Sequence, residues 1–351
     1  MSERNKAIVV NDAGDVEIVE CEKPQVGPHE VLLQMKSASL CTMEQRSYKG
    51  IVNYGNPFIG GHEACGVAVE VGDYVYNVKV GDKVVPMLSY CQQCDYCKLG
   101  KGTQCENLFK GKKRVPYEGN VFGGGLARYM VIPAYQACSI DERIPFDQAA
   151  LIEPLSCCIH SVVAANIQFG ETVVIIGAGI MGILQTQLCR MKGSRVIVSE
   201  PDPSRREFAF NMKANHVLDP SSTGIVDEVK QLTNGRGADV VINTTASHKV
   251  WDDAVELLSP FGRLIAYSSQ HPNIPSPVNF GKLHSKEFKI IGAVSPNPSD
   301  YLMASRLLSY GLIELNSVIA HRFSFEKAKE AFSKAVVPGT YRVVILHDDE
   351  N

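Results

Sequence analysis

The chain has 351 residues, of which 45% are hydrophobic and 21% are charged, with a formal net charge of −3. This composition is typical of a globular protein with a large core, and the length favours two domains. The near-neutral charge argues against nucleic acid or an anionic membrane surface as a partner. No apolar run is long enough to span a bilayer and residues 1–6 lack a signal peptide's apolar stretch, so we expect a cytoplasmic protein.

Cysteine usage points to metal binding. The chain has eleven cysteines, a high count for an intracellular protein. A secreted disulfide scaffold would be short and rich in loops, which this chain is not.

The first 90 residues predict short strands separated by glycine and proline. The expected strands cover residues 6–10, 16–20, 30–37, 67–72 and 83–87. Short strands with this punctuation, ahead of any long helix, predict a β-rich, partly barrel-like first domain.

Candidate metal ligands lie where these strands end. Cys41 follows the third strand, and His62 and Glu63 are adjacent in a later loop. Glu153 is a further acid flanked by apolar residues, where an unpaired charge would be costly. Any one of these residues alone is more often an ordinary core residue. Together, a thiol, an imidazole and a carboxylate with one open position are what a catalytic zinc requires.

The most specific pattern in the chain is C-x2-C-x2-C-x7-C, formed by Cys91, Cys94, Cys97 and Cys105. Four thiolates at this spacing close a tetrahedral site and leave no open position, so we expect a structural metal. Such a metal would hold the lobe over residues 89–107, which has too few apolar residues to hold itself.

A basic run, Lys-Gly-Lys-Lys-Arg, follows this lobe at residues 110–114. We interpret it as a solvated face, with a site for an anionic substrate as the alternative. A zinc-ribbon module that binds nucleic acid would need a basic stripe, and this run is the only cluster, so that class is disfavoured.

Residues 172–182 form the stretch around which the second half is organised. Residues 173–176 are a β-branched run, as expected for a buried parallel strand. The next six residues fit G-x-G-x-x-G, with Gly177, Gly179 and Gly182 at the glycine positions, and residues 183–191 predict a helix. A dinucleotide pyrophosphate would lie on the first free N–H groups of that helix, near Ile180 and Met181.

Glu200 stands at the end of the next expected strand, residues 195–199, where an acid should bind a ribose hydroxyl. A carboxylate accepts hydrogen bonds from a free 2′-hydroxyl and repels a 2′-phosphate, which favours NAD over NADP. Arg205 and Arg206 lie close enough in sequence to soften this preference.

The remaining pattern alternates strands and helices. Strands are expected over residues 238–243, 262–267 and 289–294, and helices over 204–212 and 250–258. This alternation predicts a doubly wound parallel sheet. After a break at residues 295–298, helices over 301–310 and 325–334 and a strand over 342–346 complete the chain.

These features together resemble the zinc-dependent medium-chain dehydrogenases over essentially the whole chain. Residues 151–156, Leu-Ile-Glu-Pro-Leu-Ser, are most similar to the sorbitol (polyol) dehydrogenase branch. The resemblance implies an α/β protein with a GroES-like catalytic domain over residues 1–150, completed by 295–351. An NAD-binding Rossmann domain would cover residues 151–294.

The resemblance also assigns site residues. The catalytic zinc ligands fall on Cys41, His62 and Glu153, and Glu63 binds the metal directly or stands just behind it. The four cysteines between 91 and 105 take the structural zinc, and the three glycines with Glu200 take NAD.

Two departures from the family's pattern bear on the substrate. Met43 stands where family members commonly have a hydroxyl that passes the alcohol proton outward, so Thr42, Glu44 or water would have to replace it. Val294 and Ser295 occupy the neighbourhood in which sorbitol dehydrogenases carry an Arg-Tyr pair that holds the polyol. The reaction class survives both departures, whereas sorbitol itself as the substrate does not follow.

The expected function is NAD-dependent oxidation of a secondary alcohol of a polyol, sugar alcohol or cyclitol to the ketone, with zinc as Lewis acid. One alternative is an amino-alcohol (threonine-type) dehydrogenase of the same fold. Another is a non-catalytic zinc-binding relative, which the intact ligand set disfavours. We expect a homodimer or homotetramer that acts on a small-molecule alcohol.

Overall fold

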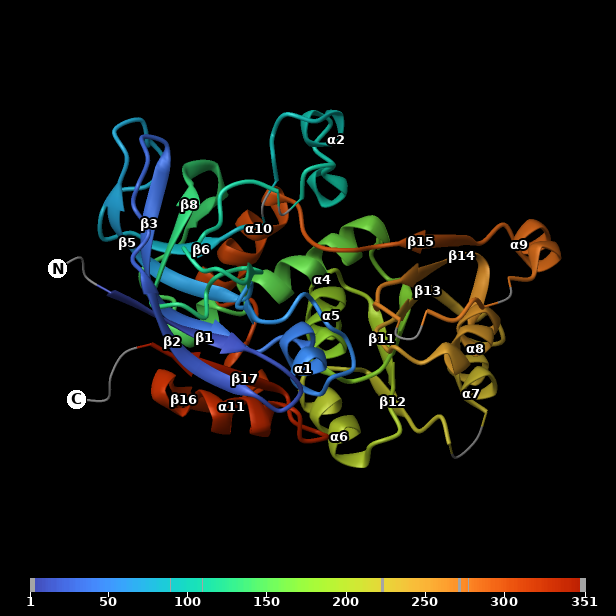
Figure 1. Cartoon of the computed structure of the whole chain (residues 1–351). Coiled ribbons are helices and arrows are strands. Elements are labelled where there is room, and N and C mark those ends of the chain that lie inside the picture. Colours follow the sequence, from blue (N-terminus) through green and yellow to red (C-terminus); the bar gives the residue numbers. More distant parts are fainter. Residues whose placement is uncertain are drawn as a thin grey trace. The chain divides into compact units, whose positions relative to one another are not determined.

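The structure is a computed structural model that describes residues 4–88, 90–108, 110–221, 224–270, 273–276 and 278–347. The chain divides into two compact units, Met1–Ser156 with Pro296–Asn351, and Cys157–Ser295. The second unit is therefore an insertion in the first along the chain (Figure 1). Among the described residues, no helix is both long and apolar enough to cross a membrane.

The second unit is built on a six-stranded sheet in the order β12-β11-β10-β13-β14-β15, and every pairing is parallel. The strands are β10 (Thr172–Ile176), β11 (Arg195–Ser199), β12 (His216–Leu218), β13 (Ala238–Asn243), β14 (Leu258–Ala266) and β15 (Lys289–Gly292). This is the strand order of the Rossmann fold, with the first strand at the centre. The predicted doubly wound parallel sheet is confirmed.

Helices make the crossovers of this unit. They are α5 (Ile180–Met191), α6 (Pro203–Asn211), α7 (Ile225–Leu232), α8 (Trp251–Glu256) and α9 (Phe280–Lys286), and α4 (Ile152–Ala164) leads into the unit. The core consists of β-branched and leucine side chains from neighbouring strands, among them Val174, Ile197, Val241 and Leu264, each 1% exposed or less.

The first unit contains two sheets. One has the order β2-β1-β4-β7; the other runs β16-β17-β3-β5-β6-β9, and β8 pairs with β3. The strands are β1 (Arg4–Val10), β2 (Val16–Glu22), β3 (Glu30–Ser39), β4 (Phe58–Ile59), β5 (Ala64–Val71), β6 (Lys83–Pro86), β7 (Asn120–Val121), β8 (Tyr129–Pro133), β9 (Ala137–Ser139), β16 (Ile319–Ser324) and β17 (Arg342–Leu346). The predicted β-rich first domain is confirmed.

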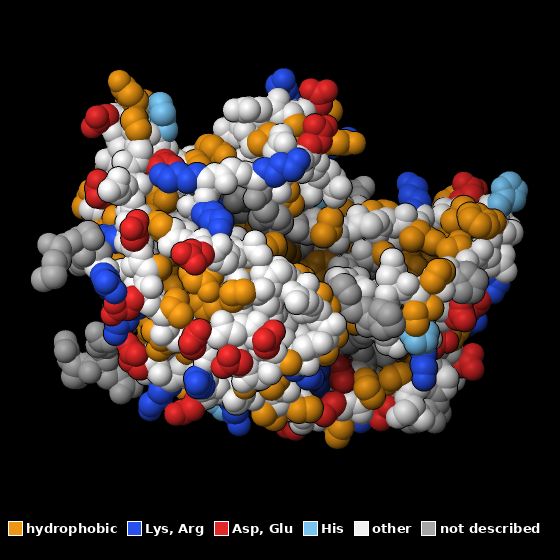
Figure 2. Space-filling view, in the orientation of Figure 1, with side chains coloured by type: hydrophobic (Ala, Val, Ile, Leu, Met, Phe, Trp, Pro, Cys, Tyr) orange, Lys and Arg blue, Asp and Glu red, His pale blue; other side chains and the backbone are white. Residues whose placement is uncertain are grey.

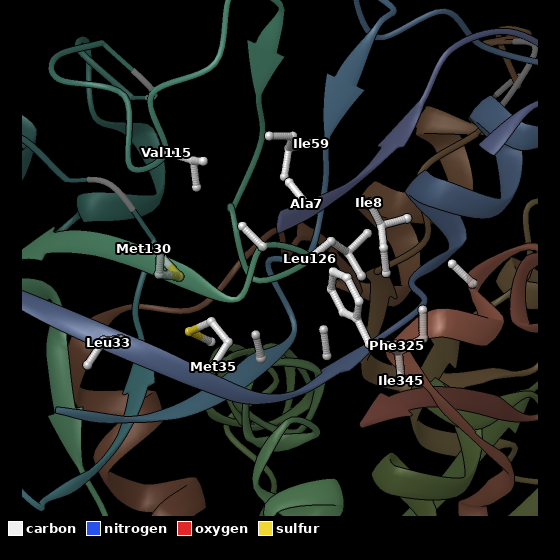
Figure 3. Packing of buried hydrophobic residues seen from close by; sticks show 14 of the residues in the cluster. Ala7, Ile8, Leu33, Met35, Ile59, Val115, Leu126, Met130, Phe325 and Ile345 are labelled. Carbon is white, nitrogen blue, oxygen red and sulfur yellow. The ribbon is translucent and has the colours of Figure 1, made fainter. Parts of the chain in front are cut away.

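The helices that accompany these sheets among the described residues are α1 (Thr42–Tyr48), α2 (Asp95–Lys98), α3 (Phe146–Ala149), α10 (Pro298–Ser309) and α11 (Ala328–Ala335). The C-terminal segment completes the unit because β17 pairs antiparallel with β3. Figure 3 shows the resulting core, in which Ile8 and Leu126 lie near Phe325 and Ile345 from the C-terminal segment, and Leu33 lies farther along β3. All five are at most 1% exposed, and each such burial contributes about 1.5–3 kcal/mol.

Helix starts differ from the expectations where a cap lies upstream of the apolar pattern. α5 begins at Ile180 rather than 183 because Gly179, in an extended conformation, serves as its N-cap. α10 begins at Pro298 rather than 301 because Asn297 and Asp300 form a capping box and proline suits the first helical position. The sequence did not predict α4, because Pro154 interrupts the helical pattern. Pro154 lies in the first turn of α4, where proline is tolerated.

Candidate active site

The turn between β10 and α5 needs glycine at two positions for its own geometry. Gly177 has φ +98°, in the left-handed region, and a Cβ on Gly182 would lie 2.0 Å from the Gly177 carbonyl oxygen. Gly179 is different, because a Cβ there would meet no atom within 4 Å. The fold does not require glycine at 179, so the space beside it remains open to a ligand.

The N-terminus of α5 can receive an anion. No side chain caps Gly179, and Ile180 and Met181 in the first turn are only partly buried. The first N–H groups of a helix lack partners within it, and the helix dipole favours negative charge there. This arrangement fits a dinucleotide pyrophosphate.

Glu200 follows β11 and binds the glycine turn. One carboxylate oxygen accepts from the Ala178 N–H at 2.8 Å and the other from the Asp202 N–H at 3.0 Å. Each oxygen has a second lone pair, so the carboxylate can still accept from a ribose hydroxyl. Arg206 donates to the Glu200 carbonyl and pairs with Asp219 at 3.0 Å, and the Arg205 N–H donates to Asp202.

The four cysteines of the C-x2-C-x2-C-x7-C pattern converge. Their sulfurs lie within 4.8 Å of one another, with Cys91 Sγ 3.9 Å from Cys97 Sγ and Cys94 Sγ 4.0 Å from Cys105 Sγ. The N–H groups of Cys94 and Gln93 donate to Cys91 Sγ and lower the pKa of that thiol to about 6. A sulfur already held as thiolate near neutral pH suits a soft metal.

A second group, Cys41, His62 and Glu63, also presents ligand atoms within 4.8 Å of one another. Cys41 is the N-cap of α1, and His62 and Glu63 lie between β4 and β5. One oxygen of Glu63 is buried without a hydrogen-bond partner among the described residues. An orphaned carboxylate oxygen beside a thiol and an imidazole is the donor set that a catalytic zinc takes. The residues present therefore fit the metal.

Glu44 holds His62 from behind and was not anticipated in this role. Its carboxylate is buried, lies 3.5 Å from His62 Nδ1 and accepts the Gly61 N–H at 2.9 Å. A Cβ on Gly60 would lie 2.7 Å from this carboxylate, so glycine at 60 makes room for it. Burial disfavours the charged imidazole, yet the charges of Cys41 and Glu44 raise the pKa of His62 well above its usual value.

Arg342, on β17, holds the other side of the group and was missed from sequence. Its guanidinium lies 2.6 Å from a Glu63 oxygen and 3.9 Å from Cys41 Sγ, and it is 4% exposed. Burial acts to lower the pKa of Arg342, but the charges of Glu63 and Cys41 outweigh it and raise that pKa above its usual value, so the arginine stays charged. An isolated arginine in an apolar strand carries no spacing signal that would have revealed this contact.

Two other sequence candidates take different places. Glu153, in the first turn of α4, is buried and adds to the negative potential at Arg342, but is not among the three side chains that converge within 4.8 Å. Met43 packs against the core of the first unit, which favours packing as its role. Phe122 lies edge-on to His62, with ring centroids 5.8 Å apart.

The chain matches two family models, the alcohol dehydrogenase GroES-like domain over residues 27–142 and the zinc-binding dehydrogenase over residues 181–309. It is 32% identical to L-threonine 3-dehydrogenase of Pyrococcus abyssi, covering 99% of both chains. It is 30% identical to D-xylulose reductase A of Aspergillus oryzae, covering 94% of this chain and 93% of that one.

This chain belongs to the zinc-dependent medium-chain dehydrogenases. The predicted family, its oxidoreductase class and its need for zinc and a nicotinamide coenzyme are confirmed. A zinc-binding dehydrogenase of Sinorhizobium meliloti bound to NADP superposes with a TM-score of 0.88 at 25% identity, covering 98% of this chain and all of that one. Galactitol-1-phosphate dehydrogenase of Escherichia coli gives 0.86 at 25% identity, covering 97% and 100%.

Proposed function

We propose that this dehydrogenase oxidises a secondary alcohol of a polyol, sugar alcohol or cyclitol to the ketone, with NAD as hydride acceptor. The observation that carries the proposal is the convergence of Cys41, His62 and Glu63 within 4.8 Å in a chain that also holds a complete dinucleotide turn. A bound zinc ion supplies a Lewis acid for the substrate hydroxyl, and a bound NAD supplies the hydride acceptor.

The chain's own residues prepare this chemistry. Cys41 and His62 would hold the metal with a carboxylate from Glu153, and Glu63 would either bind it or stand behind it. Arg342 fixes the Glu63 carboxylate through their ion pair, and Glu44 orients the His62 ring through its Nδ1 side. Residues that fix ligand orientation in this way commonly decide metal affinity.

The coenzyme would lie on Gly177, Gly179 and Gly182, with its pyrophosphate over Ile180 and Met181. Glu200 would accept from the ribose hydroxyls and so favour NAD. Arg205 stands near enough to moderate that preference, and the relative solved with NADP makes the comparison of the two coenzymes worthwhile.

The relatives support a polyol-like substrate and keep an amino alcohol as the second candidate. D-xylulose reductase is named for a ketose, the oxidised form of a polyol, and galactitol-1-phosphate dehydrogenase for the phosphate of a sugar alcohol. L-threonine 3-dehydrogenase is named for an amino alcohol and matches over 99% of this chain, which favours the second candidate.

The test is a screen of polyols, cyclitols and amino alcohols with the zinc-loaded protein, following NADH absorbance. Turnover of polyols or cyclitols with NAD supports the proposal. Turnover confined to threonine and related amino alcohols selects the second candidate. A zinc-loaded and NAD-binding protein that oxidises no secondary alcohol contradicts both.

We further propose that the chain forms a homodimer or homotetramer and acts in the cytoplasm. β15 is an edge strand of its sheet, and Phe280, Ile290 and Val294 are 75%, 39% and 56% exposed. Figure 2 shows hydrophobic side chains gathered over β14, β15 and α9, as expected of an interface. In the part of the chain that the structure describes, none of the eleven cysteines forms a disulfide bond, which fits a reducing compartment.

A further inference from the structure

The basic run at residues 110–114 separates into two parts in the structure. Lys112 Nζ lies 2.6 Å from a Glu30 oxygen, and Lys113 Nζ donates to the carbonyls of Tyr117 and Gly119 at 2.9 and 2.8 Å. Both are surface interactions of the expected kind. Arg114 instead turns inward. One of its terminal nitrogens donates to Met87 O at 2.6 Å and Gln136 Oε1 at 2.7 Å, and the other to Gly123 O at 3.3 Å.

Among the residues that the structure describes, the charge of Arg114 has no counterpart. All three of its acceptors are neutral oxygens, and within the described ranges no aspartate or glutamate lies at ion-pair distance from it. Its Nε–H is buried and has no acceptor within the described part of the chain, and the nitrogen that contacts Gly123 keeps one further N–H without an acceptor there. Arg342 shows the alternative arrangement in the same unit, a buried guanidinium matched by Glu63.

Burying an unmatched guanidinium is costly, and the fold gives it only partial compensation. Burial lowers the pKa of Arg114 to about 10, and the groups that act against this are the tyrosines Tyr301, Tyr135 and Tyr90. Neutral oxygens would satisfy a neutral glutamine at this position at lower cost. A positive charge is therefore kept where an external negative group can complete it.

Arg114 lies close to the proposed metal ligands. The carbonyl that it contacts belongs to Gly123, and a Cβ on Gly123 would lie 2.5 Å from the backbone nitrogen of His62. The preceding residue, Phe122, packs edge-on against the His62 ring. One residue thus separates the unmatched guanidinium from the backbone of His62, and the Arg114 side chain is only partly buried.

We propose that Arg114 determines specificity by receiving a carboxylate or phosphate of the substrate, so that the alcohol oxidised is an anionic one. This inference rests on the proposed function and narrows its substrate class. Lys110 and the paired lysines of the run remain surface residues.

The test compares the best neutral alcohol from the screen with its carboxylate and phosphate derivatives. For the zinc-loaded enzyme, kcat/KM should be about 10- to 100-fold higher for one anionic form, the range expected of a hydrogen bond to a charged group. The carboxylate and phosphate arms show which anion the site takes. Arg114→Gln should raise KM for that anion until the preference disappears, with kcat and the neutral substrate changed less than about threefold. Arg114→Lys should retain part of the preference.

Lys112→Met is the matched control, because it removes a cation of the same run that already has a partner, and its selectivity should equal that of the wild type. A second readout needs no turnover: inorganic sulfate and phosphate should raise the melting temperature of the wild-type holoenzyme and not that of Arg114→Gln.

Equal kcat/KM for neutral and anionic alcohols in the wild type would overturn the inference and leave the proposed function standing. So would an Arg114→Gln enzyme that loses activity on both forms alike, since that result indicates a purely structural clamp. If Arg114→Gln fails to fold, the wild-type selectivity and Arg114→Lys decide the question. An enzyme that oxidises no alcohol of any charge contradicts the proposed function itself.

Discussion

Glu63 and Arg342 illustrate how the first unit supports its candidate ligands at the scale of single residues. Their side chains are 1% and 5% exposed, so each compensates a charge of the other that would be costly to bury alone. The pair also keeps the free oxygen of Glu63 beside Cys41 and His62.

The first prediction concerns this pair. Arg342→Met leaves Glu63 buried without a partner, which typically costs about 3–5 kcal/mol. We expect a loss of that size in urea unfolding of the metal-free protein, together with weaker zinc binding. Combining Arg342→Met with Glu63→Gln should recover part of the stability, because the orphaned charge is then gone. Additive losses in the double variant would show that the two residues do not act as a pair.

The second prediction concerns coenzyme choice. Glu200→Ala removes the carboxylate that repels a 2′-phosphate, so kcat/KM with NADP should rise relative to NAD by about 10-fold or more. Because Glu200 also accepts the Ala178 N–H, activity with NAD should fall as well. Steady-state kinetics with both coenzymes measure the ratio. A wild-type enzyme that prefers NADP would contradict the assignment.

The third prediction concerns His347, which is 3% exposed and packs on Phe325. Burial, with Arg128 and Lys36 nearby, lowers the pKa of His347 to about 3. The unfolded chain takes up this proton near pH 6.5 and the folded chain does not, so stability falls as pH drops from about 6.5 toward 3. By this linkage His347 should cost about 2 kcal/mol at pH 5.

His347→Phe keeps an apolar ring against Phe325 and removes the titration. Urea unfolding at pH 7.5 and pH 5 should therefore show a smaller acid-induced loss in the variant than in the wild type. Other titrating groups are common to both proteins and cancel in the difference. Equal losses in the two proteins would show that His347 does not remain neutral in the folded state.

At this scale the sequence predicted the residues whose chemistry lies in local spacing. The four cysteines converge because their short intervals fold back on themselves, and His62 and Glu63 are adjacent in the chain. The roles of Arg342 and Glu44 could not be predicted. Arg342 on β17 contacts Glu63, which lies 279 residues earlier, and Glu44 on α1 contacts Gly61, which lies 17 residues later. Only the tertiary fold creates those contacts.

At the scale of elements, the glycine turn was predictable because a strand, a turn and a helix are continuous in sequence. The helix α4 was missed and α10 was predicted too short, because their first turns contain proline or capping residues in place of periodically spaced apolar residues. The short strand β12 was missed because three residues cannot display alternation.

The fourth prediction belongs to β15, the edge strand of the second unit. Ile290→Lys places a charge on the exposed edge, where lysine is a common device against strand pairing. We expect the variant to shift toward the monomer mass in light scattering coupled to size exclusion. Tyr76→Lys, at an 88% exposed site in the first unit, is the control and should leave the mass unchanged. A wild-type protein that is monomeric at micromolar concentration would contradict the proposed assembly.

At the scale of the whole molecule, each unit has its own apolar core, and the two metal-type clusters found among the described residues both belong to the first unit. The clusters differ in composition. One cluster offers four sulfurs, and the other offers sulfur, nitrogen and oxygen. The charge of an additional acid, Glu153, acts on Arg342 beside the second cluster. Softer and more complete donor sets hold zinc more tightly, so the two sites should differ in lability.

The last prediction follows from that difference. Zinc-loaded protein should contain two equivalents per chain, and a chelator should remove them in two phases. The first equivalent should leave the mixed site, and activity should be lost with it while the far-ultraviolet circular dichroism stays unchanged. The second should leave the four-cysteine lobe, which has little apolar burial of its own, and its amide protons should then exchange faster. Cys41→Ala should lack only the first phase and Cys97→Ser only the second, measured with a colorimetric zinc indicator. Release in a single phase, or one equivalent or fewer in fully active protein, would contradict this assignment of the two sites.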